Sequence, residues 1–310
     1  MAVNIIPTSY DIIEGHTSKA SLFSQIATDT AVLNTQCVEY GPASAITNSS
    51  SCLEFRLKKS PNFTDLSKTS LYLKIKITNP DGSTIPANVN CALVNNALGS
   101  MFGQADLQIG NQSIVSIPSP LMAYKSYVDL LLGHSKEAKS TYLKSQLFLK
   151  ENAGSLDVTK TYGKNQKELA DDPTIGTNYS LNARNLLTAK SRECELEGSL
   201  PLDFFNSSTP RYLLPNVDLH LRLWPTHDAF RIITDDPSKR YAVQIVDARL
   251  KVTEVRMAPE VITAQAIQME KHDKKALYPY TLSQFRVFNI SKNSHSFTET
   301  DIFQGEIPTQ

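Results

Sequence analysis

Cysteine is scarce in this sequence of 310 residues, and long apolar runs are missing. The cysteines form no CxxC pair, which argues against a structural zinc site and favours free thiols in a reducing compartment. The best apolar stretch, YVDLLLG at 127–133, is far too short to cross a bilayer. The N-terminus lacks the basic region and apolar core of a secretory signal. We therefore expect a cytosolic or nuclear product, neither secreted nor membrane-spanning. The four cysteines are Cys37, Cys52, Cys91 and Cys194.

The motifs of common active sites are missing as well. There is no GxxxxGK[ST], GxGxxG, GxSxG or HExxH, so phosphate loops, serine hydrolases and zinc proteases have no candidate. The acidic pairs in ADDP at 170–173 and TDDPSKR at 234–240 stand beside proline and favour turns. His220 and His227 flank one predicted strand on opposite faces, which favours solvent contact over metal binding. We assign no catalytic, cofactor-binding or metal-binding residue, expect no cofactor and predict that the protein is not an enzyme.

Charge of one sign does not dominate either. Lys plus Arg and Asp plus Glu number 31 each, so the net charge favours neither nucleic acid nor an anionic membrane. The Lys-rich KHDKK at 271–275 is explained by the solvated end of a helix.

Alternation of polar and apolar residues predicts several amphipathic strands. LYLKIKI at 71–77 and VDLHLRLW at 217–224 are the clearest, and each places its leucines and isoleucines on one face. ADLQIGNQSIVSI at 105–117 predicts a hairpin, with Gly110 and Asn111 as two positive-φ turn residues. Further strands are predicted at 52–59, 192–202 and 243–257.

Helical signals are fewer than strand signals. Apolar spacing predicts helices at 93–102, 120–133 and 135–150, and a surface helix at 259–276 that begins with proline. The polar segment 151–190 is predicted to be a long loop excursion. Amphipathic strands at regular spacing favour an antiparallel sandwich over a doubly wound α/β fold, and at this size a jelly roll is the natural candidate.

Several stretches resemble the hexon-like major capsid proteins of Maverick/Polinton (adintovirus-type) elements. They follow the order of that family and together span nearly the whole chain. The matching stretches are CVEYGPASAIT at 37–47, DLSKTSLYLKIKITNPDG at 65–82, LVNNALGSMFGQADLQIGNQSI at 93–114, YKSYVDLLLGHSKEAK at 124–139, RYLLPNVDLHLRLWPTHDAF at 211–230, VQIVDARLKVTEVRMAPEVITAQ at 243–265 and YPYTLSQFRVFNISKNSHSFTETDIFQGEIPT at 278–309.

The resemblance implies a mainly β fold, with an antiparallel jelly roll as the first barrel of a double jelly roll. Residues 1–256 would form this barrel, with an inserted loop and helical excursion at about 118–190. Residues 257–276 would form a connector helix, and 277–310 the beginning of a second barrel that stops short at Gln310. We accordingly expect an N-terminal portion of such a protein, with residues after about 277 poorly packed against the first barrel.

The resemblance also implies a function. It predicts a structural capsid protein of the virion that forms homotrimers, contacts neighbouring capsomers and penton or minor capsid proteins, and assembles in the host cytoplasm or nucleus. One alternative remains open at this point. The chain could be an endogenised remnant in a host genome that acts as a binding module or has no function.

Overall fold

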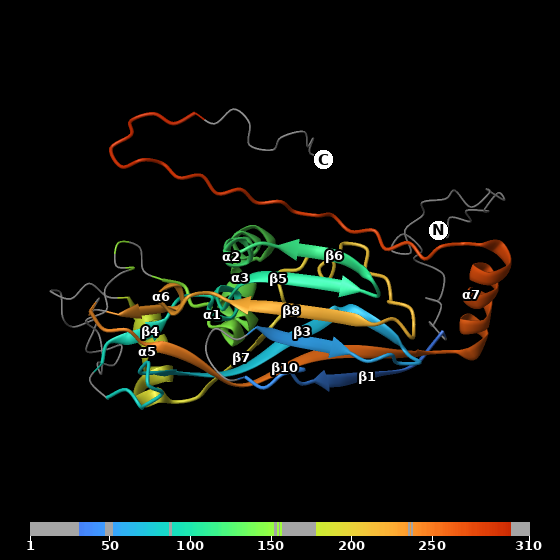
Figure 1. The fold of residues 1–310 in the computed structure, drawn as a ribbon, viewed down its shortest axis with the longest axis horizontal. Coiled ribbons are helices and arrows are strands. Elements are labelled where there is room, and N and C mark those ends of the chain that lie inside the picture. Colours follow the sequence, from blue (N-terminus) through green and yellow to red (C-terminus); the bar gives the residue numbers. More distant parts are fainter. Residues whose placement is uncertain are drawn as a thin grey trace, which may run out of the picture.

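Three antiparallel sheets form the framework of the computed structural model (Figure 1). Two of the sheets have four strands each and face one another, and the third has two strands. The mainly β architecture predicted from the sequence is therefore confirmed. The structure describes residues 31–46, 52–86, 89–151, 154, 156, 178–234, 236 and 238–298.

The two large sheets are built from strands distant in the sequence. The first has the order β1-β10-β3-β7, and the second has the order β2-β8-β5-β6. The strands of the first sheet are β1 (Val32–Tyr40), β10 (Ala242–Met257), β3 (Phe63–Thr78) and β7 (Cys194–Gly198). Those of the second are β2 (Leu53–Leu57), β8 (Leu219–Pro225), β5 (Phe102–Ile109) and β6 (Gln112–Ile117).

The strand pairing is nested along the chain. Of these eight strands in sequence order, the first pairs with the eighth, the second with the seventh, the third with the sixth and the fourth with the fifth. A long antiparallel hairpin folded over on itself gives this pattern, and successive strands alternate between the sheets except β5 and β6, which share one sheet. Eight strands in two facing sheets with such Greek-key connections define a jelly roll. The predicted jelly-roll sandwich is confirmed by this order.

The core lies between the two large sheets, where every second side chain points inward. In β3, Leu71, Leu73, Ile75 and Ile77 are fully buried, and the residues between them are part-exposed. In β8, Leu221 and Leu223 are fully buried in the same way. Burial of each such side chain contributes about 1.5–3 kcal/mol, so the alternation sets which face of each strand is inside.

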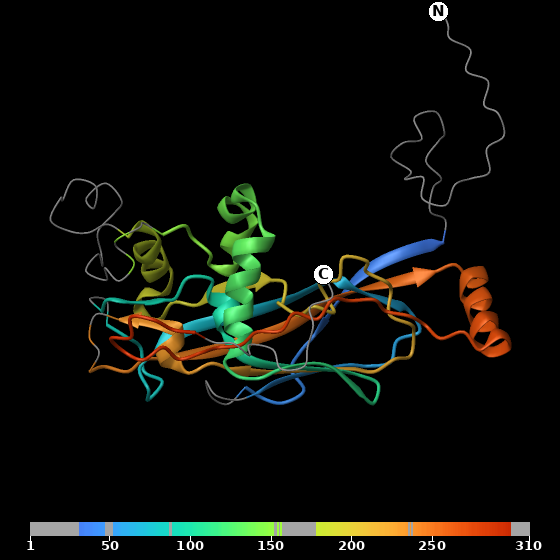
Figure 2. The same cartoon turned by 90° about the horizontal axis from the view of Figure 1, so that it is seen from above.

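Short elements close the two ends of the sandwich. β4 (Cys91–Leu93) pairs with β9 (Ile232–Thr234) in the small sheet. In Figure 2 the green helix α2 rises from one face of the sandwich, while the orange helix α7 lies at the far end. The helices are α1 (Ala97–Ser100), α2 (Leu121–Gly133), α3 (Lys136–Ser140), α5 (Tyr179–Thr188), α6 (Asp228–Arg231) and α7 (Pro259–His272), with 3-10 turns η2 (Tyr142–Gln146) and η3 (Ala189–Ser191). None of the helices in these ranges combines the length and apolar character that crossing a membrane needs.

The β5–β6 hairpin confirms a prediction and corrects a detail of it. The two strands are joined by Gly110 and Asn111, as the sequence predicts. Only Gly110 has a positive φ, of 58°, so a single left-handed residue suffices for the turn. A positive φ at the first central position alone indicates a type II′ turn, whereas positive φ values at both central positions would have indicated type I′.

Several elements escape the sequence analysis: the short β4, β9 and α6, and also β1 and α5. Strand β1 shows no polar–apolar alternation because it is an edge strand with most of its residues exposed. Helix α5 lies in the segment predicted as a loop, because most of the side chains that it buries are polar. It buries Ser180, Asn182, Arg184 and Asn185, while Leu186 and Leu187 are exposed. An amphipathic pattern based on apolar residues cannot detect such a helix. Residues 157–177 of the predicted excursion lie outside the described residues.

The predicted helices are found with changed bounds. The predictions at 120–133 and 259–276 correspond to α2 and α7, and α7 ends at His272 because Asp273 takes a left-handed conformation with φ of 47°. The stretch 135–150 forms two short helical elements, α3 and η2. The stretch 93–102 holds only the four residues of α1, because its two ends belong to strands β4 and β5.

A buried carboxylate joins β1, β10 and the chain before β3. Glu254 in β10 accepts hydrogen bonds from Asn62 Nδ2 at 2.8 Å, Tyr40 Oη at 3.2 Å and Gln36 Nε2 at 3.3 Å. Burial alone would raise the pKa of Glu254. Hydrogen bonds to the charged form, including one from Ser60, outweigh burial, so the pKa lies below its ordinary value of 4.5.

Glu254 is therefore expected to contribute to acid unfolding. A carboxyl group with a lowered pKa stabilises the fold fully above its unfolded pKa, and this stabilisation is lost as the pH falls through the lower folded pKa. The Glu254→Gln variant should lose less stability than the parent when the pH is lowered from 5 to 3, measured by urea unfolding at each pH. Glu260→Gln on the exposed helix α7 is the control. An acid dependence in Glu254→Gln as steep as that of the parent would contradict the assignment.

Candidate functional site

The histidines and carboxylates noted in the sequence do not converge on one site. His220 Nε2 lies 2.6 Å from Glu54 Oε1 on the outer face of the second sheet, and Glu54 is also paired with Arg56. His227 is the N-cap residue of α6, where its side chain makes no capping bond. No group of three or more His, Cys, Asp or Glu side chains that could hold a metal is found in the described part of the chain.

The acidic pairs behave as turn residues where they can be seen. Asp236 accepts hydrogen bonds from the backbone N–H of Ser238 at 3.1 Å and from its hydroxyl. These bonds hold the pKa of Asp236 below its ordinary value. The pair at 170–173 lies outside the described residues, as does Asp235.

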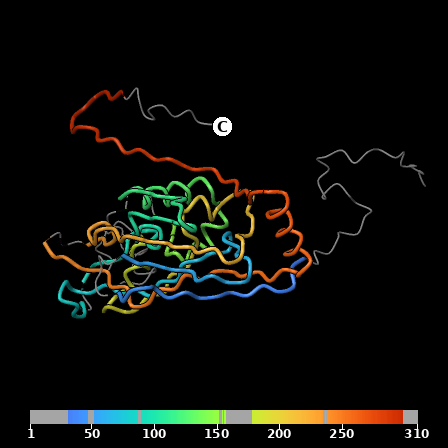
Figure 3. The backbone as a smooth tube through the Cα atoms, turned by 45° about the vertical axis from the view of Figure 1, so that its right-hand side comes forward, coloured from blue at the N-terminus to red at the C-terminus, as the bar shows by residue number. Residues whose placement is uncertain are grey.

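The most distinctive feature is the path of the chain after α7. Beyond Asp273 the chain reverses and runs back along the jelly roll as an extended segment without joining either sheet, the red trace in Figures 1 and 3. We call residues 277–285 the strap. Its first hydrogen bonds are to the loop before β8. Arg211 Nη1 donates to the carbonyl of Leu277 at 2.9 Å, and Ser207 Oγ donates to the carbonyl of Pro279 at 2.8 Å.

Two tyrosines fasten the strap to the barrel. Tyr278 and Tyr280 both contact the ring of Phe204, with ring centroids 6.2 Å and 5.3 Å apart. The Tyr278 hydroxyl accepts a bond from the backbone N–H of Leu214 at 3.1 Å, and the Tyr280 hydroxyl donates to the carbonyl of Ile114 in edge strand β6 at 3.3 Å. Burial raises the pKa of Tyr278. The two rings follow the i, i+2 spacing of an extended chain, so both reach the same side.

A buried lysine anchors the far end of the strap. Lys125 of α2 is 2% exposed, and its Nζ lies 2.8 Å from Asp129 Oδ2 and 2.8 Å from Asp203 Oδ1. Asp203 in turn accepts hydrogen bonds from the backbone N–H of Ser283 at 2.8 Å and from its hydroxyl at 3.3 Å. The ring of Phe285 lies 5.6 Å from Lys125 Nζ. One ammonium group thus links α2, the loop after β7 and the strap.

The chain beyond the strap exposes apolar side chains. Val287, Phe288 and Ile290 are 57%, 40% and 63% exposed, and no strand is formed between 273 and 298. The prediction of poor packing after about 277 therefore holds for these residues and is wrong for the strap. The strap is attached because its two tyrosines and Ser283 find specific partners on the barrel.

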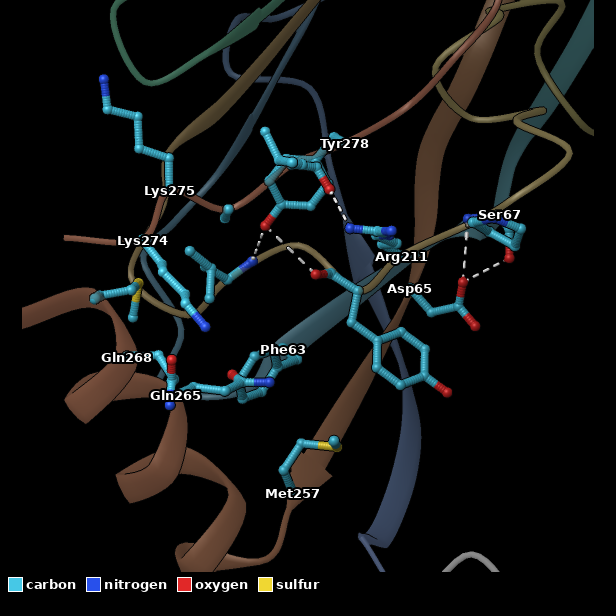
Figure 4. A pocket seen from close by; sticks show the side chains of 16 residues that line it. Phe63, Asp65, Ser67, Arg211, Met257, Gln265, Gln268, Lys274, Lys275 and Tyr278 are labelled. Atoms are coloured by element: carbon cyan, nitrogen blue, oxygen red, sulfur yellow. Dashed lines mark hydrogen bonds between the residues drawn. The ribbon is translucent and has the colours of Figure 1, made fainter. Parts of the chain in front are cut away.

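A cavity of about 560 Å³ lies where the strap begins (Figure 4). It is open to solvent on one side and is lined by the end of the barrel, by α7 and by residues 274–278. Phe63 and Met257 come from β3 and β10, Gln265 and Met269 from α7, and Lys274 from the turn after α7. Because residues 274–278 line it together with α7 and the end of the barrel, this cavity depends on the reversal of the chain at Asp273.

Helix α2 presents a second apolar surface. Tyr124, Tyr127, Leu131 and Leu132 of this helix are all exposed, and the ring of Tyr124 packs edge-to-face on that of Phe230 at 6.1 Å. Lys125 connects α2 to the end of the strap, because it belongs to this helix and contacts Phe285.

Part of this arrangement carried a signal in the sequence. Lys125 and Asp129 have the i, i+4 spacing of an ion pair on a helix, but Lys125 falls on the apolar face, where lysine is rarely buried unless paired. Asp203, 78 residues further on, completes the pair and has no sequence signal of its own. Tyr278 and Tyr280 carry no signal in the sequence that indicates their common partner.

Comparison with known proteins gives matches only among solved structures. No model of a protein family matches the chain, and no curated protein does. A chain of the cryo-EM structure of the Sputnik virophage is 13% identical, with a TM-score of 0.46, and the alignment covers 84% of this chain and 55% of that one. For the mavirus major capsid protein the identity is 15%, the TM-score 0.38 and the coverages 84% and 54%. For the Faustovirus major capsid protein they are 9%, 0.41, 81% and 58%.

The chain spans about half the length of these solved structures. Major capsid proteins of viruses are thus among the structures to which it is similar. The assignment of the jelly roll rests on the nested strand order described above.

Proposed function

We propose that this chain is the N-terminal part of a double jelly-roll major capsid protein of the Maverick/Polinton type. The observation that carries the proposal is the path of the chain after its eighth jelly-roll strand. The first jelly roll is complete at Met257, yet the chain continues through α7 and the strap into an extended segment with exposed apolar residues. The order of the family-like stretches in the sequence supports the same assignment. In this proposal residues 1–256 belong to the first barrel, 257–276 connect, and 277–310 begin the second.

The role of such a subunit is geometric and not enzymatic. Two similar barrels in one chain allow a homotrimer to present six near-equivalent edges, so flat hexagonal tiles can form the facets of an icosahedral shell. Obligate interfaces of this kind bury about 2,000 Å² or more, and neighbouring capsomers and penton or minor capsid proteins would supply the other contacts. The exposed apolar residues of α2 and of the segment after the strap are suitable contact surfaces. The protein would then be located in the virion.

The proposal is tested by expressing the whole reading frame that contains these residues and measuring the oligomeric state of the protein. We expect trimers by light scattering and trimers or shells by electron microscopy. In the variant Phe288→Asp/Ile290→Asp, two charges replace apolar groups that are exposed in the described structure. The unfolding of the first barrel should be unchanged, while the trimer should be lost. Asn289→Asp adds charge at the neighbouring position as the control. A parent protein that stays monomeric would contradict the proposal.

The second candidate is the endogenised remnant that acts as a binding module. It is favoured by the same exposed segment, because an extended chain with apolar side chains and no sheet partner can add to the edge of another sheet. It predicts a monomer whose residues 286–298 are cut rapidly by proteases, whereas a completed second barrel would protect them.

A further inference from the structure

The cavity between α7 and the start of the strap has an apolar floor. Phe63 is 3% exposed, and Met257 and Met269 also line the cavity. A volume of about 560 Å³ falls within the range of cavities that hold small ligands. Methionine side chains adapt to different shapes, which suits a flexible apolar group.

The charges at the cavity are unbalanced toward positive. The cationic side chains of Arg211 and Lys274 lie there with one acidic residue, Asp65; Lys275 also belongs to the lining, but its side chain points away from α7. Asp65 is already engaged by the backbone N–H and hydroxyl of Ser67 and by Lys68 at 3.3 Å. Figure 4 shows Lys274 pointing from the turn after α7 toward that helix, and Lys275 pointing away from it. Within the described residues, Lys274 forms no ion pair.

An acceptor completes the site. The side-chain oxygen of Gln265 is buried and accepts no hydrogen bond from any described residue. A buried polar atom without a partner costs free energy, so such an atom in the wall of a cavity indicates a ligand or water donor. The cavity therefore offers a cation, a buried acceptor and an apolar floor.

We propose that this cavity binds a small amphipathic carboxylate with an amide N–H beside the carboxylate. Lys274 neutralises the carboxylate, Gln265 accepts from the amide N–H, and Phe63, Met257 and Met269 receive the apolar chain. This is the chemistry of an N-acyl amino acid, and a peptide C-terminus shares it. Because the ligand contacts both α7 and the start of the strap, its binding stabilises the reversed path of the chain. The proposal goes beyond a capsid role and does not depend on it.

Calorimetric titration of the full chain with N-decanoylglycine tests the proposal. Three analogues each remove one feature: decanoate lacks the amide N–H, N-decanoylglycinamide lacks the charge, and N-acetylglycine lacks the apolar chain. N-decanoylglycinamide loses the charge-assisted hydrogen bond to Lys274 and should bind about tenfold or more weakly. Decanoate loses the neutral hydrogen bond to Gln265 and should bind about fivefold more weakly. Acetyl-Leu-Leu-Gly with a free carboxylate represents a peptide C-terminus. Whether it or N-decanoylglycine binds more tightly shows whether the natural ligand is a peptide C-terminus or an N-acyl amino acid.

Two variants form a matched pair for this titration. Lys274→Gln should weaken binding of N-decanoylglycine by about tenfold or more, whereas Lys275→Gln should retain it because that side chain points away from α7. Both positions are exposed, so both variants should keep the thermal unfolding transition of the parent. Each of three results would overturn the proposal. The two variants could bind N-decanoylglycine equally well, N-decanoylglycinamide could bind the parent as tightly as N-decanoylglycine does, or neither N-decanoylglycine nor acetyl-Leu-Leu-Gly could bind at millimolar concentration.

Discussion

Arg184→Ala is expected to lower the free energy of unfolding by about 3 kcal/mol, near the lower end of the range for breaking buried ion pairs. Arg184 is fully buried in α5, with Nη2 2.5 Å from Glu151 Oε1 and Nε donating to the carbonyl of Leu93 in β4 at 2.9 Å. The variant leaves the Glu151 carboxylate without its cation, the Leu93 carbonyl without its donor, and a cavity in place of the side chain. Glu151 is 19% exposed, so water offsets part of the loss.

Urea unfolding followed by circular dichroism measures this effect. Arg192→Ala removes an exposed arginine of the same region and should change the stability by less than about 0.5 kcal/mol. Arg184→Met removes the positive charge but keeps much of the side-chain volume, so it separates the contribution of the charge to stability from that of the cavity. Adding Glu151→Gln to Arg184→Met should recover part of the loss, because the unpaired carboxylate is removed. If Arg184→Ala unfolds at the urea concentration of Arg192→Ala, the ion pair does not hold α5 on the small sheet.

Lys125→Met should have an effect of similar size, about 3–5 kcal/mol, and should also release the strap. Without the ammonium group, Asp129 and Asp203 face one another without a cation, and Asp203 is only 10% exposed. The cation–ring contact with Phe285 is lost at the same time. We therefore expect faster hydrogen exchange at the backbone N–H of Ser283, which is bonded to Asp203.

Hydrogen exchange measured by mass spectrometry separates the release of the strap from the general loss of stability in Lys125→Met. Lys136→Met, at an exposed position of α3, is the control. Lys125→Met/Asp203→Asn removes one of the two facing carboxylates and should restore part of the stability. Unchanged exchange in the strap of a destabilised Lys125→Met would show that Lys125 supports α2 alone.

The sequence predicts this fold best where burial follows a simple period. β3 and β8 were recognised because their leucines and isoleucines occupy alternate positions between two sheets. β1 was missed because an edge strand with mostly exposed residues needs no alternation, and α5 was missed because it buries polar groups that are satisfied by distant partners. Such partners are set by the tertiary fold, so local periodicity carries no information about them.

The strap shows the same limit for the candidate site. The resemblance implies that residues after about 277 pack poorly against the first barrel, whereas the strap is attached to it. That attachment depends on Phe204, Asp203 and Lys125, which lie 74–160 residues before the strap residues that they contact. Of these contacts, only the i, i+4 pair of Lys125 and Asp129 could have been recognised in advance.

The nested pairing of the jelly roll has a consequence for synthesis of the protein on the ribosome. β1 pairs with β10 alone, and partners such as Gln36 and Glu254 are separated by 218 residues. At 5–20 residues per second, β1 therefore waits roughly 10–40 s for its partner to be synthesised. Of the pairs in the two large sheets, only β5 and β6 are neighbours in the sequence. Most of the sandwich must therefore form after translation has passed Met257, and the early strands are exposed to association with other chains until then.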